Sequence, residues 1–426
     1  NTDPTKTLEV AGPMRITDGG TTVCDLSAEA GTTWTHQSKI TPPSGAAADR
    51  FGCSVSISGD GSYAIVGAYG DDRPGQPAGD NVGSAQIYVR SGSTWSHQAQ
   101  ITHPSQALGD SFGFSVSISG DGSYAIAGVY ADDPTYYNAG SAQIYVRSGS
   151  TWSHQAQITA PDRAQDDRFG FSVSISGDGS YALVGAYRDD PPYNSGSAYI
   201  FSRSGTNWTF QQKITAPDPA NSDQFGFSVS ISSDGSYAIA GANRDDSSSG
   251  SAYIFSRSGS TWTFQQKITA PDRAFTDYFG YSVSISSDGS YAIASAYLDD
   301  DNGSSSGSAY IYSRSGSTWT FRSKVKAPDA AAGDCFGYGV SISGDGSYAL
   351  VGAWRDDGPA GTPQPDWGSA YIYSRSGTSW TFQQKITAPD PEPGVRFGSG
   401  VSLSGDGVYA IAGAFLGNAA IGCAYI

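Results

Sequence analysis

The sequence predicts an all-β fold, a seven-bladed β-propeller whose blades are four-stranded antiparallel sheets. Two observations predict it. One unit recurs seven times along the 426 residues, and each complete unit holds four short stretches rich in Val, Ile, Tyr or Phe, bounded by Gly, Ser, Asp or Pro. A single hydrophobic core stops growing at about 250–300 residues, so a chain of this length divides or repeats. Each copy contains a Phe-Gly pair, at Phe51, Phe112, Phe169, Phe225, Phe279, Phe336 and Phe397.

The unit from Asp167 to Asp218 shows the strands in order. In its first strand, bulky residues alternate with small ones, which predicts one bulky and one small face. The bulky face holds Phe169, Phe171, Val173 and Ile175, and the small face holds Gly170, Ser172, Ser174 and Ser176. We expect the other strands at residues 181–186, 197–202 and 208–215, with glycine-containing hairpin turns after the first and third strands.

The two ends of the chain complement each other. Residues 397–426 hold only the first three strands of a unit, whereas residues 31–43 match the fourth strand of the other units. We therefore expect one composite blade that closes the ring and leaves no open sheet edge. This divides the chain into a polar N-terminal extension, residues 1–22, and the propeller, residues 23–426.

Four motifs of each unit resemble a known repeat. They are the Phe-Gly start, the Ser-Val-x-Ile-Ser strand, the Val-Gly-Ala end of the second strand and the Gly-Ser-Ala-Tyr-Ile strand. Together they resemble FG-GAP repeats, the units of the integrin α-subunit propeller and of many secreted or surface proteins of microbes. The resemblance spans residues 31–426 and implies extracellular recognition, as in adhesion receptors and integrin-like lectins of fungi.

The sequence departs from that family at its calcium loop. Many FG-GAP repeats carry a DxDxDGxxD loop between the first two strands, where alternate carboxylates converge on one ion. Here that connector is SGDG or SSDG, with one acid per copy, so the family's calcium role does not transfer to these hairpins. We interpret the single acids as turn residues: Asp60, Asp121, Asp178, Asp234, Asp288, Asp345 and Asp406.

The copies differ almost entirely in the loops between strands two and three and between strand four and the next unit. An up-and-down blade places these two loops on one rim. Divergence confined to one rim predicts that this rim carries the binding specificity. Relaxed constraint on exposed loops is the alternative interpretation, and both remain open.

This rim is acidic. Six copies open the loop between strands two and three with paired acids: Asp71 and Asp72, Asp132 and Asp133, Asp189 and Asp190, Asp245 and Asp246, Asp299 and Asp300, Asp356 and Asp357. Six copies also carry an acid two residues before the Phe, at Asp49, Asp110, Asp167, Asp223, Asp277 and Asp334, where the last copy has Val395. Oxygen ligands suit Ca²⁺, so a calcium site at the aspartate pairs is one hypothesis. Turn-forming or solvated acids are the other. We predict no other cofactor.

Aromatic residues in the variable loops are the candidate ligand contacts. Seven of the nine tryptophans sit at one repeated place after the third turn and are interpreted as repeat packing. The remaining candidates are Tyr136, Tyr137, Tyr193, Trp354 and Trp367, whose flat rings beside polar groups suit stacking on sugar rings. Local packing within the loops is the competing interpretation.

The four cysteines are consistent with a secreted protein. Cys24 precedes the N-terminal strand and Cys423 lies in the C-terminal strand of the same composite blade, so a disulfide between them is an expectation. Cys53 and Cys335 fall in blades that are not neighbours, and we expect two thiols there. The sequence shows no signal peptide, and we expect the mature form of a protein located outside the cell or at its surface.

Composition narrows the function. With 40 acidic and 24 basic residues the net charge is −16, which is against a nucleic-acid partner, and no apolar run is long enough for membrane insertion. The residues show no catalytic motif, so we do not expect an enzyme. The sequence therefore predicts a recognition protein that binds glycans in a lectin-like manner, or surface proteins. The alternatives are a structural or adhesive assembly protein and a propeller glycoside hydrolase or polysaccharide lyase. Ligand identity and oligomeric state are not determined by the sequence.

Overall fold

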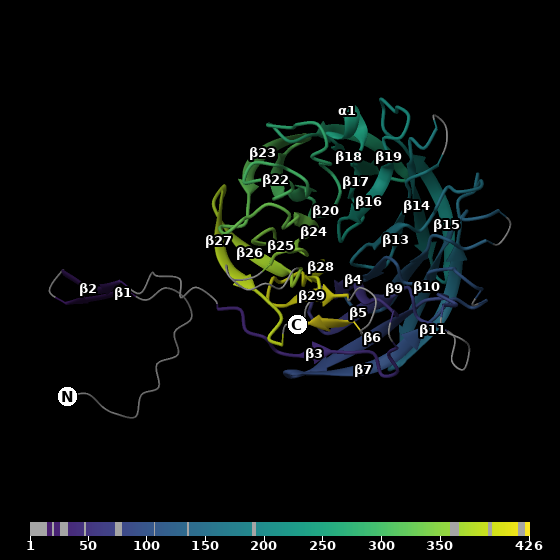
Figure 1. The fold of residues 1–426 in the computed structure, drawn as a ribbon, viewed down its shortest axis with the longest axis horizontal. Helices are drawn as coiled ribbons and strands as arrows, with labels where there is room; N and C mark the ends of the chain where they lie inside the picture. The colour runs from purple at the N-terminus through teal and green to yellow at the C-terminus, as the bar shows by residue number, and fades with distance from the viewer. Residues whose placement is uncertain are drawn as a thin grey trace. The chain divides into compact units, whose positions relative to one another are not determined.

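The computed structural model describes residues 15–18, 21–25, 33–46, 48–72, 79–105, 107–133, 136–189, 193–357, 366–390, 394–415 and 422–426. The chain forms two compact units, Asn1–Thr35 and His36–Ile426. The first contains an antiparallel pair, β1 (Arg15–Asp18) and β2 (Thr21–Asp25). Within the second, seven four-stranded sheets run around a ring, which confirms the predicted propeller (Figure 1).

Six blades consist of four consecutive antiparallel strands. Blade 1 holds β4 (Phe51–Ile57), β5 (Tyr63–Ala68), β6 (Ser84–Ser91) and β7 (Thr94–Ile101). Blade 2 holds β8 (Val116–Ile118), β9 (Tyr124–Val129), β10 (Ser141–Ser148) and β11 (Thr151–Ile158). Blade 3 holds β12 (Ser172–Ile175), β13 (Tyr181–Ala186), β14 (Ser197–Ser204) and β15 (Asn207–Ile214).

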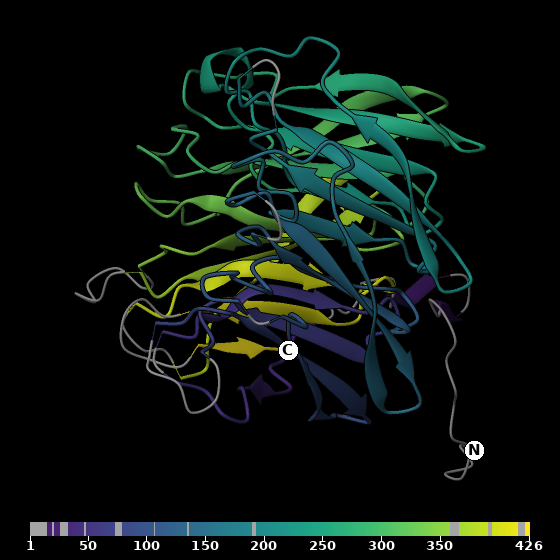
Figure 2. The ribbon, with the colours of Figure 1, turned by 90° about the vertical axis from the view of Figure 1, so that its right-hand side faces the viewer.

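The same order continues through the next three blades. Blade 4 holds β16 (Phe225–Ile231), β17 (Tyr237–Ala242), β18 (Ser251–Ser258) and β19 (Thr261–Ile268), with the short segment α1 (Asp245–Ser248) between β17 and β18. Blade 5 holds β20 (Val283–Ile285), β21 (Tyr291–Ala296), β22 (Ser308–Ser315) and β23 (Thr318–Val325). Blade 6 holds β24 (Phe336–Ile342), β25 (Tyr348–Ala353), β26 (Ser369–Ser376) and β27 (Ser379–Ile386). Figure 2 shows these sheets from the side, with the teal turn of α1 at the upper left.

Blade 7 is the composite blade that the sequence predicts. It holds β28 (Phe397–Leu403), β29 (Ala410–Ala414), β30 (Cys423–Tyr425) and, from the N-terminal side, β3 (Lys39–Ile40). Lys39 pairs with Tyr425 and Ile40 with Ala424, and the backbone N–H of Gln37 donates to the Ile426 carbonyl at 2.7 Å. The two ends of the propeller therefore close the ring by strand pairing.

The core lies between adjacent blades. In one cluster, Leu183 and Ile200 of blade 3 pack against Phe225, Val229 and Tyr253 of blade 4, all buried. The small face of the innermost strands also lies at the contact between adjacent blades. A Cβ on Gly185 would lie 2.0 Å from the Gly226 carbonyl oxygen, so that glycine is required by close approach of the next blade.

Serines of the innermost strands bond one blade to the next. The backbone N–H of Val173 donates to Ser115 Oγ at 3.0 Å, and that of Ile175 donates to Ser117 Oγ at 3.2 Å. The same bond recurs at other blade junctions. The small face predicted from the sequence is thus both a steric and a hydrogen-bonding requirement.

One detail of the first strand was predicted wrongly. Phe171 does not share the buried face of Phe169, because the chain turns at Gly170, whose φ is +90°, and the Phe171 N–H donates to the Arg168 carbonyl. The ring instead joins a row of stacked aromatics on neighbouring innermost strands. Ring centroids are 4.8 Å apart for Phe114 and Phe171 and 5.0 Å apart for Phe171 and Phe227. Tyr281 and Tyr338 continue this row.

The single acids of the first hairpins are turn residues, as predicted. Asp60 Oδ1 accepts from Ser58 Oγ at 2.7 Å and from the Ser62 N–H at 2.9 Å. The same serine-to-aspartate bond is present in all seven copies.

Candidate ligand-binding rim

At six blade junctions two sets of loops meet and form what we call the loop rim: the loop between the second and third strands of one blade, and the loop leading into the next blade. At the junction of blades 2 and 3, Gly140 and Phe169 form a parallel bridge, and the Asp166 N–H donates to the Tyr137 carbonyl at 2.9 Å. The bridge recurs at five further junctions. The two variable loops therefore share one rim.

In blades 3–6 the first aspartate of each pair is buried in a cage of lysine, tyrosine and a second acid. In blade 4, Lys267 Nζ lies 2.6 Å from Asp245 Oδ2 and 2.9 Å from Asp218 Oδ2. Tyr253 Oη lies 2.7 Å from Asp245 Oδ2 and 2.9 Å from Asp218 Oδ1. The equivalent sets are Asp162, Asp189, Tyr199 and Lys213; Asp272, Asp299, Tyr310 and Lys324; and Asp329, Asp356, Tyr371 and Lys385.

The cage changes proton affinity in a consistent direction. Burial acts to lower the pKa of Lys267, but its hydrogen bonds to Asp245 and Asp218 outweigh burial, and the pKa is raised. For Asp218, burial acts to raise the pKa, and the bonds from Lys267 and Tyr253 outweigh it, so the pKa is lowered. At neutral pH Lys267 and Asp218 are therefore both charged, and the lysine lies between two acids.

The second aspartate of each described pair holds a rim loop in place, its own loop in four of five cases. Asp72 accepts from the Gly79 and Asn81 N–H groups, each at 2.9 Å. Asp133, Asp300 and Asp357 accept from backbone N–H groups further along their loops in the same way, and Asp246 pairs with Arg273. Asp190 lies outside the described residues. These contacts support the interpretation of the pairs as loop-forming acids.

Blade 5 shows how the oxygens of such a cluster are used. Carboxylate oxygens of Asp272, Asp299 and Asp301 approach within 4.8 Å of one another, the only such group of three among the described residues. Lys324 Nζ lies among them, at 2.8, 2.8 and 2.6 Å. The oxygen donors suit Ca²⁺ chemically, but in this cage the lysine ammonium already supplies the positive charge.

Blades 1 and 2 depart from the cage. Gln86 and Gln143 stand where the other blades have the tyrosine, and Gln100 and Gln157 stand where they have the lysine. The aspartates of these two blades therefore lack the lysine cation. Gln157 Nε2 donates to Asp132 Oδ2 at 3.2 Å, and Gln100 Nε2 donates to Asp71 Oδ2 at 3.2 Å.

In blade 2 a histidine lies between two of these acids. His103 is buried, with Nδ1 3.4 Å from Asp110 Oδ2 and Nε2 3.5 Å from Asp132 Oδ2. Ser105 Oγ lies 2.7 Å from Nδ1. Burial lowers the pKa of His103 although Asp132 opposes it, and burial together with Asp132 raises the pKa of Asp110 to about 7. Sequence spacing did not reveal this trio, because its members come from two different loops.

The predicted aromatic contacts divide into two groups. Tyr136, Tyr137 and Tyr193 are exposed, at 48%, 62% and 68% of their surface. Trp354 and Trp367 are half-buried. The Trp354 ring lies 5.2 Å from that of Tyr338 and under the guanidinium of Arg396, so it packs at the end of the axial aromatic row. The loop-packing interpretation therefore describes Trp354.

Sequence reasoning missed two exposed apolar side chains on the same rim. Leu108 is 64% exposed and Phe275 is 73% exposed, and both lie in loops that lead into a blade. A single apolar residue within a polar, turn-forming loop was the available signal. Leaving such a side chain in water forgoes about 1.5–3 kcal/mol of burial free energy, so exposed apolar residues gathered on one rim point to an interaction surface.

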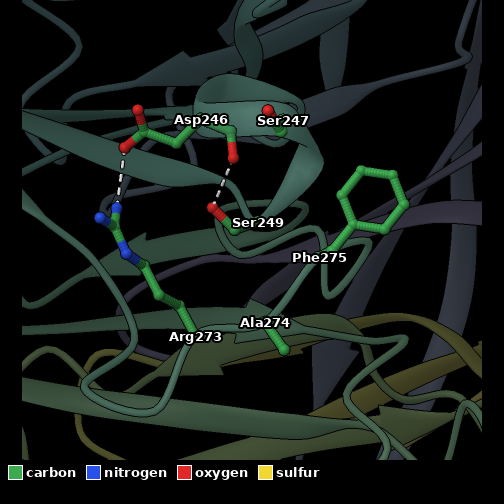
Figure 3. A pocket seen from close by; sticks show the side chains of 6 residues that line it. All are labelled: Asp246, Ser247, Ser249, Arg273, Ala274 and Phe275. Atoms are coloured by element: carbon green, nitrogen blue, oxygen red, sulfur yellow. Dashed lines mark hydrogen bonds and ion pairs between the residues drawn. The ribbon is translucent and has the colours of Figure 1, made fainter.

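Two cavities border α1, and Phe275 lines one of them. One, of about 330 Å³, is lined by Asp246, Ser247, Ser249, Arg273, Ala274 and Phe275 (Figure 3). The second, of about 620 Å³, is lined by residues that include Asn221, Ser222, Arg244, Asp246 and Ser247. Asp246 and Ser247 line both cavities, so α1 is the wall between them.

The turn of α1 is left-handed. Asp246, Ser247 and Ser248 have φ values of 50°, 63° and 66°. Left-handed helical geometry costs an L-residue about 1–2 kcal/mol, and none of the three is glycine. The Ser248 N–H donates to the Arg244 carbonyl and the Gly250 N–H to the Asp245 carbonyl, each at 2.9 Å, which holds the turn in place.

The cysteines give no test of the predicted disulfide. Cys423 is buried in β30 with Sγ 3.3 Å from Tyr425 Oη, whereas the side chain of Cys24 lies outside the described residues. The bridge stays a prediction. Cys53 and Cys335 are thiols, and burial raises their pKa to about 12 and about 11.

The repeats and the paired rim loops define a seven-bladed β-propeller. The FG-GAP repeat family matches at residues 34–88, 95–145, 152–201, 208–255, 262–312, 319–373 and 380–426. The chain belongs to the FG-GAP repeat family, whose propellers are protein-binding or adhesion-type domains, typical of extracellular or surface proteins. No curated protein matches the chain. In the part of the chain that the structure describes, no helix is long and apolar enough to cross a bilayer.

Proposed function

We propose that this chain is an extracellular, non-enzymatic recognition protein that binds a glycan through its loop rim. One observation carries the proposal: exposed apolar side chains occupy four successive blade junctions on that rim. They are Leu108, Tyr136, Tyr137, Tyr193 and Phe275. Flat rings beside hydroxyl, amide and carboxylate groups suit the alternating C–H and O–H surfaces of a sugar.

A surface protein is the second candidate ligand. The arc of exposed side chains crosses several junctions, and a standard protein interface needs about 800 Å² per partner, which is more than one cavity offers. An adhesive assembly role would use the same arc.

The acid–histidine trio of blade 2 is the one described cluster suited to proton transfer, and its burial argues against substrate contact.

The test is a binding comparison of the wild-type protein with Tyr137→Ala. We expect glycan binding, measured on an array and by calorimetry, to weaken about tenfold, since a hot-spot ring contributes about 1.4 kcal/mol or more. The matched control is Phe210→His, which alters an exposed ring on the outer strand to the residue that blade 1 has there, His97. Binding to a cell-surface protein and to no glycan would identify the second candidate. Turnover of a polysaccharide would refute the non-enzymatic proposal.

We further propose that any calcium bound at the aspartate pairs lies in blades 1 and 2, where glutamine replaces the lysine of the cage. There Ca²⁺ would neutralise Asp71 or Asp132. We expect added Ca²⁺ to raise the melting temperature, EDTA to reverse it, and Asp71→Asn with Asp132→Asn to abolish the response. A melting temperature and ligand affinity that ignore both Ca²⁺ and EDTA would reject the calcium hypothesis.

A further inference from the structure

We propose that the rim of blades 3–5 is an extended groove for a neutral oligosaccharide of at least two sugar units, with Phe275 and Tyr193 as stacking platforms and α1 as the polar wall between two subsites. The inference rests on the proposed function. It adds the ligand class and the residues that would hold it.

The two cavities beside α1 supply the subsites. Both are open depressions, of about 330 and about 620 Å³, and α1 lines both, so a linear ligand that occupied the two would cross α1. Polar residues line each cavity: Ser247, Ser249 and Arg273 line the first, and Asn221 and Arg244 line the second. These groups offer donors and acceptors for sugar hydroxyls.

An exposed aromatic residue belongs to the loops at each cavity. Phe275 lines the first, and Figure 3 shows its ring on the side opposite Asp246 and Arg273. The backbone of Tyr193 joins the loop that lines the second, because its carbonyl accepts from the N–H of Ser222, a lining residue, at 2.9 Å. Both rings are more than two-thirds exposed, at 73% and 68%, so their faces are open to a ligand.

The charges favour a neutral ligand. In the first cavity Arg273 Nη1 pairs with Asp246 Oδ2 at 2.8 Å. The charges of these two side chains therefore balance, and both still offer directional hydrogen bonds. The second cavity is lined by Asp218, Asp223, Asp245 and Asp246 with Arg244 as its one lining cation, so an anionic sugar would be repelled. Asp218 and Asp245 are already paired with Lys267, so a cationic ligand gains little there.

The next junction provides a natural control for the substitutions. The loop leading into blade 6 has Ala330 and Ala332 where the loop leading into blade 5 has Arg273 and Phe275. Arg273→Ala and Phe275→Ala therefore recreate a loop that this chain already folds. Phe264→His is the control for an exposed ring elsewhere, since blades 1 and 2 carry histidine at that position of the outer strand.

The test titrates the full chain with neutral di- and tetrasaccharides of glucose, galactose, mannose and N-acetylglucosamine, using calorimetry and saturation-transfer NMR. We expect Phe275→Ala and Arg273→Ala each to weaken binding at least tenfold, Tyr193→Ala to weaken the tetrasaccharide more than the disaccharide, and Phe264→His to leave both unchanged. Circular dichroism checks the fold of each variant.

Two outcomes would overturn the groove, and they separate it from the proposed function. Binding that survives Phe275→Ala and Arg273→Ala but is lost in Tyr137→Ala would show that the rim binds glycans elsewhere. Failure of every neutral sugar, with retained binding to a charged glycan or to a surface protein, would reject the ligand class while the recognition function stands.

Discussion

At the scale of single residues, the acids that precede the Phe-Gly pairs have unusual proton affinity. Burial, reinforced by neighbouring carboxylates, raises the pKa of Asp110 and Asp167 to about 7 and that of Asp277 and Asp334 to about 6, against backbone N–H bonds that act to lower it. A carboxyl with a raised pKa stabilises the fold below its unfolded pKa and loses that contribution as pH rises through the folded value.

We predict that Asp110 and Asp167 raise the melting temperature as the pH falls from 8 to 5, against a smaller opposite contribution from His97, His103 and His154, whose pKa values burial lowers. Over this window the folded protein takes up protons at Asp110 and Asp167 that the unfolded chain, with aspartate pKa near 4, does not bind. Asp110→Asn should flatten part of the dependence, measured by scanning calorimetry. A melting temperature that falls steadily from pH 8 to 5 would contradict these pKa shifts. Below about pH 4 the trend should reverse, because the lysine-paired Asp162 and Asp218 have lowered pKa values.

At the scale of elements, the cage of lysine, tyrosine and two acids fixes the rim loops of blades 3–6 to their blades. Lysine comes from the fourth strand, tyrosine from the third, and the acids from two loops. The cage thus connects the uniform strands to the variable loops. The loops can differ in sequence and still remain attached to their blade.

Replacing the lysine of one cage tests this connection. We expect Lys213→Gln to destabilise the protein by about 1–3 kcal/mol, because Asp189 is left buried without a cation. The double variant Lys213→Gln with Asp189→Asn should recover much of the loss, because it removes the buried carboxylate charge that the single variant leaves without its cation. Urea unfolding at pH 8 measures both. Equal stability of wild type and Lys213→Gln would mean that the cage is not a structural connection.

Strands and closure were predictable because their signals are local and repeated: period-two alternation, glycine turns and the split unit at the ends. The turn at Gly170 was not predictable, because the alternation of bulky and small residues continues through it. The sequence pattern therefore does not show that Phe171 leaves the strand. The cages were also hidden, since Lys213 and Asp162 are 51 residues apart and meet only through strand register. Phe275 and the trio around His103 each occur in one blade only. Comparing the repeats therefore gives no signal for them.

At the scale of the whole molecule, closure depends on β3, a strand of two residues against eight in the other outermost strands. We expect removal of residues 1–41 to leave β30 as an open edge, lower the melting temperature and promote self-association. Removal of residues 1–32 retains β3 and the bonds of Gln37 and Ser38 to Ile426, and is the control. Calorimetry and light scattering measure both. Indistinguishable truncations would show that β3 does not hold the ring.

The direction of that closing pair determines how the ring responds to force. Gln37 bonds to Ile426, so the outer end of β3 lies against the last residue of the propeller. A load pulling these two points apart would act across the hydrogen bonds and break them one after another, as in unzipping, instead of stretching them together in shear. The propeller should therefore resist heat far better than tension applied at its ends, with the composite blade opening first.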